Sequence, residues 1–172
     1  MDGMHYEGTV IRPPSEADSI ILQVTVGCSH NKCTFCGTYK GERFRIKDDR
    51  VIDADLDYAS KHLSFLSRVF IADGDALIMP QKRLAALLEK IREKMPWVRR
   101  VGLYGNAKSI LLKQPEELAK LRELGLGIVY LGLESGDAQV LRDIRKGFSP
   151  ERMTEAGQRV REAGIKLSVT AL

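Results

Sequence analysis

Segments with strand character alternate with segments with helical character five times along the chain, and this alternation restricts the fold more than any other feature. Apolar runs predict strands over residues 20–26, 68–72, 97–104, 127–133 and 165–172. Apolar residues at helical spacing predict helices over 53–65, 81–94, 116–123, 137–144 and 150–163. This order is typical of parallel βα units. We therefore expect an α/β fold on a parallel sheet, whose apolar strands suit a cover of helices.

The chain is expected to form one core domain, residues 19–172, after an N-terminal extension of residues 1–18. Its 172 residues, 44% of them hydrophobic, are enough for one substantial core. The last strand-like run reaches Leu172 with no helix after it. That pattern favours the front part of a TIM-like (β/α) barrel, truncated after about strand five, over a complete open sheet, because exposed sheet edges promote association.

Charge and hydropathy restrict the partners and the cellular compartment that we expect for the protein. The net charge is +4, from 27 basic and 23 acidic residues, and the densest basic stretches, residues 43–50 and 142–152, also carry acids. This predicts a mixed charged surface with no clear nucleic-acid-binding face. No apolar run approaches the roughly 20 residues of a membrane span, and the N-terminus lacks the pattern of a secretory signal. We expect a cytoplasmic protein without a membrane partner.

The only three cysteines, Cys28, Cys33 and Cys36, lie together just after the first predicted strand. An odd number argues against a disulfide framework, and a tight cluster in a reducing compartment favours metal ligation. Three thiolates can hold three corners of an iron–sulfur cluster and leave the fourth iron open. The alternatives are inert thiols or a zinc site, which needs four ligands. The nearest fourth candidate, His30, is too close to Cys28 for common zinc spacings.

Polar residues also follow the next three predicted strands, where ligands gather in parallel β/α folds. These residues are Asp73, Gly74 and Asp75, then Gly105 and Asn106, and then Glu134, Ser135 and Gly136. Because the carboxyl ends of parallel strands share one edge of the sheet, we expect a single site there. Residues 39–47 are expected to form a solvated linker, His30 to lie on the loop surface, and Tyr104 to pack in the core.

The cysteine loop, Phe35 just before its last cysteine, and the β/α order resemble the radical S-adenosylmethionine (radical SAM) enzymes over residues 20–172. Within these enzymes they resemble the subgroup of oxygen-independent coproporphyrinogen oxidase, the Elongator catalytic subunit and the methylthiotransferases. The four residues between Cys28 and Cys33 are one more than the commonest family spacing.

The resemblance implies a [4Fe–4S] cluster whose open iron binds the amino and carboxylate groups of S-adenosylmethionine. Reductive cleavage of that nucleotide yields a 5′-deoxyadenosyl radical, which abstracts hydrogen from a substrate. An electron donor such as flavodoxin or ferredoxin is the implied partner. The substrate stays open among porphyrins, transfer RNA, protein side chains and small metabolites. Two other classes remain: an iron–sulfur electron-transfer or redox-sensing protein, which would need a fourth protein ligand, and a zinc-binding interaction domain.

The resemblance also assigns roles to individual positions, none of them a catalytic side chain. Cys28, Cys33 and Cys36 are the implied cluster ligands, and Phe35 shields the cluster on its adenosyl side. The segment 73–75 takes the place of the family's glycine-rich motif, which contacts the methionine amino group, with Asp75 the implied carboxylate. An ordinary strand-to-helix turn is the alternative for that segment.

The remaining implied contacts lie further along the chain. Glu134, with Ser135 beside it, would meet the ribose hydroxyls. Lys146, next to Arg145, would pair with the methionine carboxylate, and a solvated helix end is its alternative. Asn106 is expected either to bond the ligand or to cap the turn that follows it.

Overall fold

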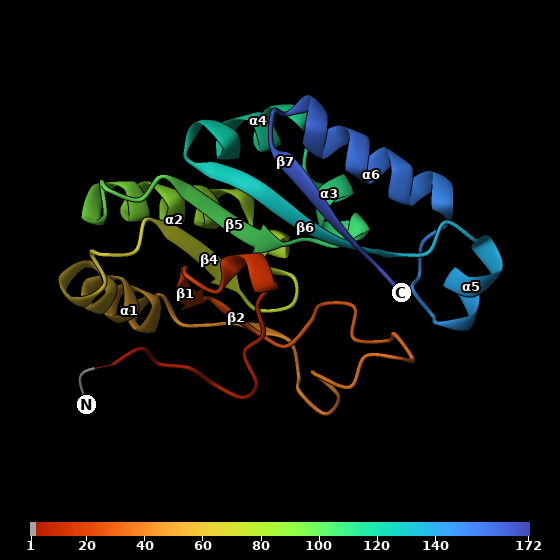
Figure 1. Cartoon of the computed structure of the whole chain (residues 1–172), viewed down its shortest axis with the longest axis horizontal. Helices are drawn as coiled ribbons and strands as arrows, with labels where there is room; N and C mark the ends of the chain where they lie inside the picture. The colour runs from red at the N-terminus through yellow and green to blue at the C-terminus, as the bar shows by residue number, and fades with distance from the viewer. Residues whose placement is uncertain (1–2) are drawn as a thin grey trace.

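The computed structural model describes residues 3–172, and within them a curved sheet of five parallel strands forms the centre of the molecule (Figure 1). The strands are β1 (Ile20–Gln23), β4 (Arg68–Ala72), β5 (Arg100–Tyr104), β6 (Leu126–Glu134) and β7 (Lys166–Ala171). They lie in the order β1-β4-β5-β6-β7, and each adjacent pair is parallel. The predicted α/β class and parallel sheet are confirmed.

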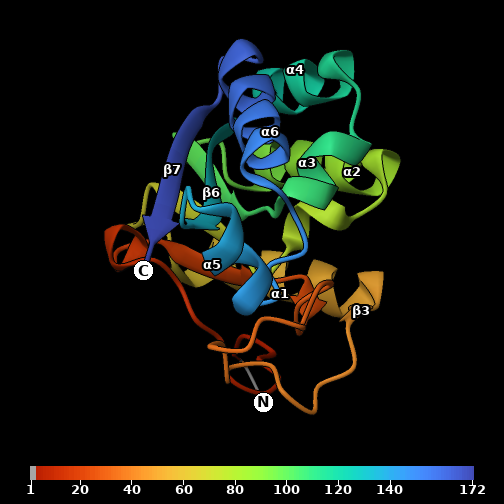
Figure 2. The same cartoon turned by 90° about the vertical axis from the view of Figure 1, so that its right-hand side faces the viewer.

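Helices cover one face of this sheet (Figure 2). The α-helices within residues 3–172 are α1 (Asp49–His62), α2 (Gln81–Lys94), α3 (Ala107–Leu112), α4 (Pro115–Glu123), α5 (Ala138–Asp143) and α6 (Pro150–Glu162). Successive strand residues point to opposite faces. Val69 and Ile71 of β4 therefore join the main core with Leu84 of α2. None of the helices in the described part of the chain combines the length and apolar character needed to cross a bilayer.

The other face of the sheet carries no α-helical layer within residues 3–172. Phe70 and Ala72 of β4 form a small second cluster there with Tyr130 of β6. Val10, from the N-terminal segment, packs against this cluster. Strand residues that point to one face of the sheet thus contact the helices. Those that point to the other face contact either the N-terminal segment or a cavity.

The first predicted strand, residues 20–26, is divided in the structure. β1 ends at Gln23, and the next residues form β2 (Thr25–Val26), which pairs antiparallel with β3 (Arg45–Ile46) in a separate two-stranded sheet. The division occurs at Val24, whose N–H donates to the Ala72 carbonyl while its own carbonyl accepts from the Lys47 N–H. The β2–β3 pair therefore joins the two ends of the cysteine loop.

Some elements begin at residues other than those predicted from hydrophobic periodicity, and side-chain caps explain where the helices α1 and α3 start. α1 begins at Asp49, four residues before the predicted start at 53, because the Asp48 side chain accepts the Arg50 N–H. The short helix α3 was not predicted, and its Asn106 cap accepts the Ser109 N–H at 2.9 Å. β5 begins at Arg100, after the predicted start at 97, and the Trp97 indole before it donates to the Leu66 carbonyl.

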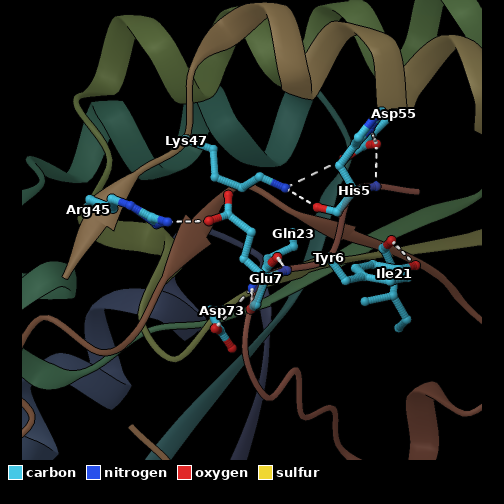
Figure 3. A network of polar contacts seen from close by, with 9 residues as sticks. All are labelled: His5, Tyr6, Glu7, Ile21, Gln23, Arg45, Lys47, Asp55 and Asp73. Carbon is cyan, nitrogen blue, oxygen red and sulfur yellow. Dashed lines mark hydrogen bonds and ion pairs between the residues drawn. The ribbon is translucent and has the colours of Figure 1, made fainter. Parts of the chain in front are cut away.

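The N-terminal segment, predicted as an extension, is attached to the core by polar contacts (Figure 3). The His5 N–H donates to the Asp55 carboxylate at 2.8 Å, and Lys47 donates to the His5 carbonyl. The Glu7 backbone exchanges two hydrogen bonds of 2.8 Å with the Gln23 side chain. Asp55 and Lys47 are buried, so this contact is internal to the fold.

A second attachment of the N-terminal segment lies against the face of the sheet that carries no α-helices within the described residues; we call it the open face. The 3₁₀ turn η1 (Pro14–Glu16) places Glu16 where none of its surface is exposed. Its carboxylate accepts from Arg100 and from the Tyr130 hydroxyl, each at 2.5 Å. A buried charge needs such partners, so η1 is held firmly against β5 and β6.

Candidate active site

A cavity of about 260 Å³ lies at the carboxyl edge of the sheet and is shared by the cysteine loop and four strand ends. Gly74 follows β4, Asn106 follows β5, Glu134 ends β6 and Thr170 belongs to β7. All three cysteines line the same cavity. The structure thus brings the loop and the strand-end residues to one place.

The three cysteines are free thiols, each partly exposed. Burial raises the pKa of Cys28 and of Cys33, and the nearby Lys146 charge opposes that rise at Cys33. Because their pKa values are raised, the Cys28 and Cys33 thiols keep their protons at neutral pH. A metal ligand must be deprotonated, so loading the site releases protons.

The cysteine loop is tied to the body of the protein along its length. The Gly74 N–H donates to the Gly27 carbonyl at 3.2 Å, before the first cysteine. The Thr34 N–H donates to the Ile144 carbonyl at 2.9 Å, and the Asn31 amide donates to the Tyr39 carbonyl at 2.8 Å. These bonds hold the loop over the cavity.

Asp73 supports the loop from below and is itself buried. It accepts from the Tyr39 hydroxyl. It also accepts, at 3.3 Å, from Gln23, the residue that bonds Glu7 (Figure 3). Burial raises the pKa of Asp73 despite these donors. Tyr39 is only 5% exposed, so the expected solvated linker is wrong for this residue and for the buried Lys47.

Gly74 lines the cavity where no larger residue fits. A Cβ atom added there would lie 2.7 Å from the Tyr39 ring and 3.0 Å from the Cys28 Cβ. The absence of a side chain lets the backbone approach the cavity and the cysteine loop at the same time.

Asp75 lies behind the cavity wall, and none of its surface is exposed. Its carboxylate accepts from the Ser29 hydroxyl, from the Ser109 hydroxyl at 2.6 Å, and from the Asn106 backbone and amide at 3.1 and 2.9 Å. The structure therefore gives Asp75 a supporting position in place of the expected contact with an amino group. It joins Ser29, next to Cys28, to the start of α3.

Asn106 both lines the cavity and caps α3. Its amide donates to Asp75 and to the Ser29 hydroxyl, and its carbonyl oxygen accepts the Ser109 N–H. Of the two roles considered for Asn106, the cap is present in the structure.

Glu134 and Lys146, twelve residues apart, form an ion pair of 3.1 Å inside the cavity. Their side chains are 10% and 12% exposed. Glu134 has a φ of +65° where the β6–β7 register shifts, which turns its side chain towards Lys146. A Cβ at Gly132 would lie 2.6 Å from the Glu134 Oε1 atom, so a larger residue there would displace the ends of the paired side chains. Ser135 does not line the cavity, and its hydroxyl accepts the Asp137 N–H before α5.

Aromatic side chains form the apolar part of the cavity. Phe35 is 44% exposed at the rim, and Phe148 lies among the lining residues. Tyr104 packs edge-on against Phe70 at 5.1 Å, as expected, and also lines the cavity with Tyr130. Burial, chiefly, raises the pKa of Tyr104 to about 12, so its phenol is neutral.

Sequence reasoning missed several residues of this cavity. Tyr130 had a usable signal, because it alternates with apolar residues that face the helices and so belongs to the open face of β6. Tyr39 and Phe148 had none, since their positions depend on contacts with segments remote in sequence.

The donor set suits an iron–sulfur cluster, because thiolates are the ligands that such clusters require. Cys28, Cys33 and Cys36 line one cavity, where three thiolates can reach a single cluster.

Comparison with known proteins identifies the family to which this chain belongs. Residues 22–172 match the family model of the radical SAM superfamily. The chain is 26% identical over 159 residues to bacteriochlorophyllide d C-8(2)-methyltransferase of Chlorobaculum tepidum, and 25% identical over 158 residues to a putative methylthiotransferase of Methanocaldococcus jannaschii. Each alignment covers 87% of this chain and 34% of the relative, so the chain spans about a third of their length.

A solved structure shows the same fold. The cobalamin-dependent S-adenosylmethionine radical enzyme OxsB matches 88% of this chain and 23% of its own with a TM-score of 0.72, at 21% identity. The fold is that of the core domain of this S-adenosylmethionine radical enzyme. The chain belongs to the radical SAM superfamily, whose cofactors are a [4Fe–4S] cluster and S-adenosylmethionine. The superfamily predicted from the cysteine loop is confirmed.

Proposed function

We propose that this chain holds the cluster and the nucleotide of a radical SAM enzyme. Cys28, Cys33 and Cys36 would hold a [4Fe–4S] cluster, and Gly74, Glu134 and Lys146 would surround S-adenosylmethionine. The observation that carries the proposal is that these six residues line one cavity. When bound, the cluster supplies the electron for reductive cleavage of the sulfonium, which yields a 5′-deoxyadenosyl radical that abstracts hydrogen from the substrate.

The chain's own residues bind and orient the nucleotide. The Lys146 ammonium suits the methionine carboxylate. The Glu134 carboxylate can accept hydrogen bonds from two ribose hydroxyls. Because these two side chains already form a pair, each is held in the cavity by the other before a ligand engages them. The amino group would approach the wall at Gly74, with Asp75 acting through its support of that wall.

The aromatic part of the cavity gives it a low polarity. Phe35 at the rim would shield the adenosyl side, and Tyr104 and Tyr130 form the floor. Exclusion of water protects a reactive radical from side reactions. The neutral phenol of Tyr104 can donate or accept one hydrogen bond without placing a charge beside it.

Anaerobic reconstitution tests the proposal directly. Iron and sulfide should bind at about four of each per chain, and the dithionite-reduced sample should give a cubane signal in electron paramagnetic resonance that shifts when S-adenosylmethionine is added. Release of 5′-deoxyadenosine should accompany the shift. Zinc without iron, or a signal that the nucleotide leaves unchanged, would contradict the assignment.

Lys146→Met should weaken binding of S-adenosylmethionine by about ten- to a hundredfold, since a hydrogen bond to a charged group contributes about 1.5–3 kcal/mol. Cluster absorbance should persist, because the three thiols remain. The measurement is a nucleotide titration followed by electron paramagnetic resonance. Arg145→Met is the matched control: Arg145 does not line the cysteine cavity, so its replacement should leave the affinity unchanged. Equal losses in both variants would contradict the specific role of Lys146.

A further inference from the structure

A second hollow, of about 730 Å³, adjoins the cysteine loop on its helix side. Four of its lining residues are cationic and come from three separate segments: Lys32 from the cysteine loop, Lys108 from α3, and Arg142 and Arg145 from the region of α5. No acidic residue lines it within residues 3–172. We call it the basic hollow.

The four cations of the basic hollow are exposed, and none of them has a carboxylate within ion-pair distance in the described part of the chain. The acids that neighbour them in sequence make other contacts, and Arg142 itself donates to the Gln139 side chain. Asp143 accepts from Gln139, and Glu155 pairs with Arg152 and Arg159. The hollow therefore has a positive surface, although the sequence around residues 142–152 carries both signs of charge.

The basic hollow is next to the cysteine cavity but distinct from it. The two share His30 and Phe148, and no strand residue lines the basic hollow. The His30 ring bonds the Arg145 carbonyl at 2.8 Å, which ties the cysteine loop to this surface. A partner seated here would reach the back of the cysteine loop while the sheet side of the cavity stays free for nucleotide and substrate.

We propose that the basic hollow is the docking surface for an acidic one-electron carrier protein that reduces the cluster. The proposal rests on the proposed function, because it assumes a cluster on the adjoining cysteines. The carrier loses one electron and the cluster gains it, with no bond formed or broken. A protein partner is favoured over a small anion, because the cations are exposed and distributed among three segments, as in a complementary charged interface.

The test uses a flavodoxin of net negative charge and the variant Lys108→Glu/Arg142→Glu. Neither residue lines the cysteine cavity. Surface plasmon resonance should show the dissociation constant of the flavodoxin complex rising about tenfold or more, and binding by the unaltered protein should weaken with added salt. Formation of 5′-deoxyadenosine with reduced flavodoxin should fall similarly, whereas its formation with dithionite should be unchanged.

Lys61→Glu/Arg92→Glu is the matched control. It makes the same change in charge in the last turns of α1 and α2, away from the basic hollow, and should leave flavodoxin binding intact. The proposal is overturned if both double variants bind flavodoxin equally well. It is also overturned if Lys108→Glu/Arg142→Glu loses dithionite-driven activity, or if only a phosphate-bearing ligand such as RNA distinguishes the two variants. Failure of the unaltered protein to form 5′-deoxyadenosine with dithionite would instead refute the proposed function.

Discussion

Cys33→Ala is expected to abolish the absorbance of the cluster and all release of 5′-deoxyadenosine from S-adenosylmethionine. Cys33 lies between the other two cysteines in sequence and lines the same cavity, and the chain contains no fourth cysteine to replace it. A cluster held by two thiolates would lose a third of its protein ligands. Absorbance after anaerobic reconstitution, together with quantification of 5′-deoxyadenosine, measures both losses.

The fold should survive this substitution. Cys33 is partly exposed and belongs to neither core cluster, so its thiol contributes little to packing. The helical signal in circular dichroism should stay close to that of the unaltered protein. Thr34→Ala is a suitable control in the same loop, because the bond from residue 34 to the Ile144 carbonyl is made by its backbone N–H and remains. Unaltered cleavage activity in Cys33→Ala would refute cluster ligation by this loop.

The fold could be predicted where local pattern determines structure. The ranges predicted for β4 and α2 agree with the structure, because an apolar run of β character and a repeated leucine face are local features. The first strand could not be divided correctly, because its interruption at Val24 depends on bonds to Ala72 and Lys47. Those residues are distant in sequence, and no periodicity reports on them.

The site could be predicted in position but only partly in detail. Strand-end reasoning led to Gly74, Asn106 and Glu134, and the structure gathers all three around one cavity. The same reasoning assigned a ligand contact to Asp75, which the structure places behind the wall. The direction of a side chain after a strand depends on which donors lie around it. For Asp75 these come from segments 46 residues before and up to 34 residues after it in the chain.

Asp75→Ala is expected to destabilise the protein by about 3 kcal/mol and to lower the iron content after reconstitution. The variant would remove the acceptor of the Ser29 hydroxyl and one of two acceptors each from the Ser109 hydroxyl and the Asn106 amide. An unsatisfied buried donor costs about 1–3 kcal/mol. Relief from burying a carboxylate offsets part of this loss, since burial already raises the pKa of Asp75. Urea unfolding followed by circular dichroism gives the change in stability.

The loss of iron distinguishes support of the site from a general loss of stability. Ser29 directly follows Cys28 in the loop, so releasing Ser29 frees the first cysteine to move away from the cavity. Asp18→Ala removes an exposed carboxylate that has no hydrogen-bond or ion-pair partner among residues 3–172, and it should change stability by less than about 0.5 kcal/mol. Reconstitution is therefore compared at a temperature where both variants are folded. If Asp75→Ala then binds as much iron as Asp18→Ala, Asp75 stabilises the fold without positioning the cysteine loop.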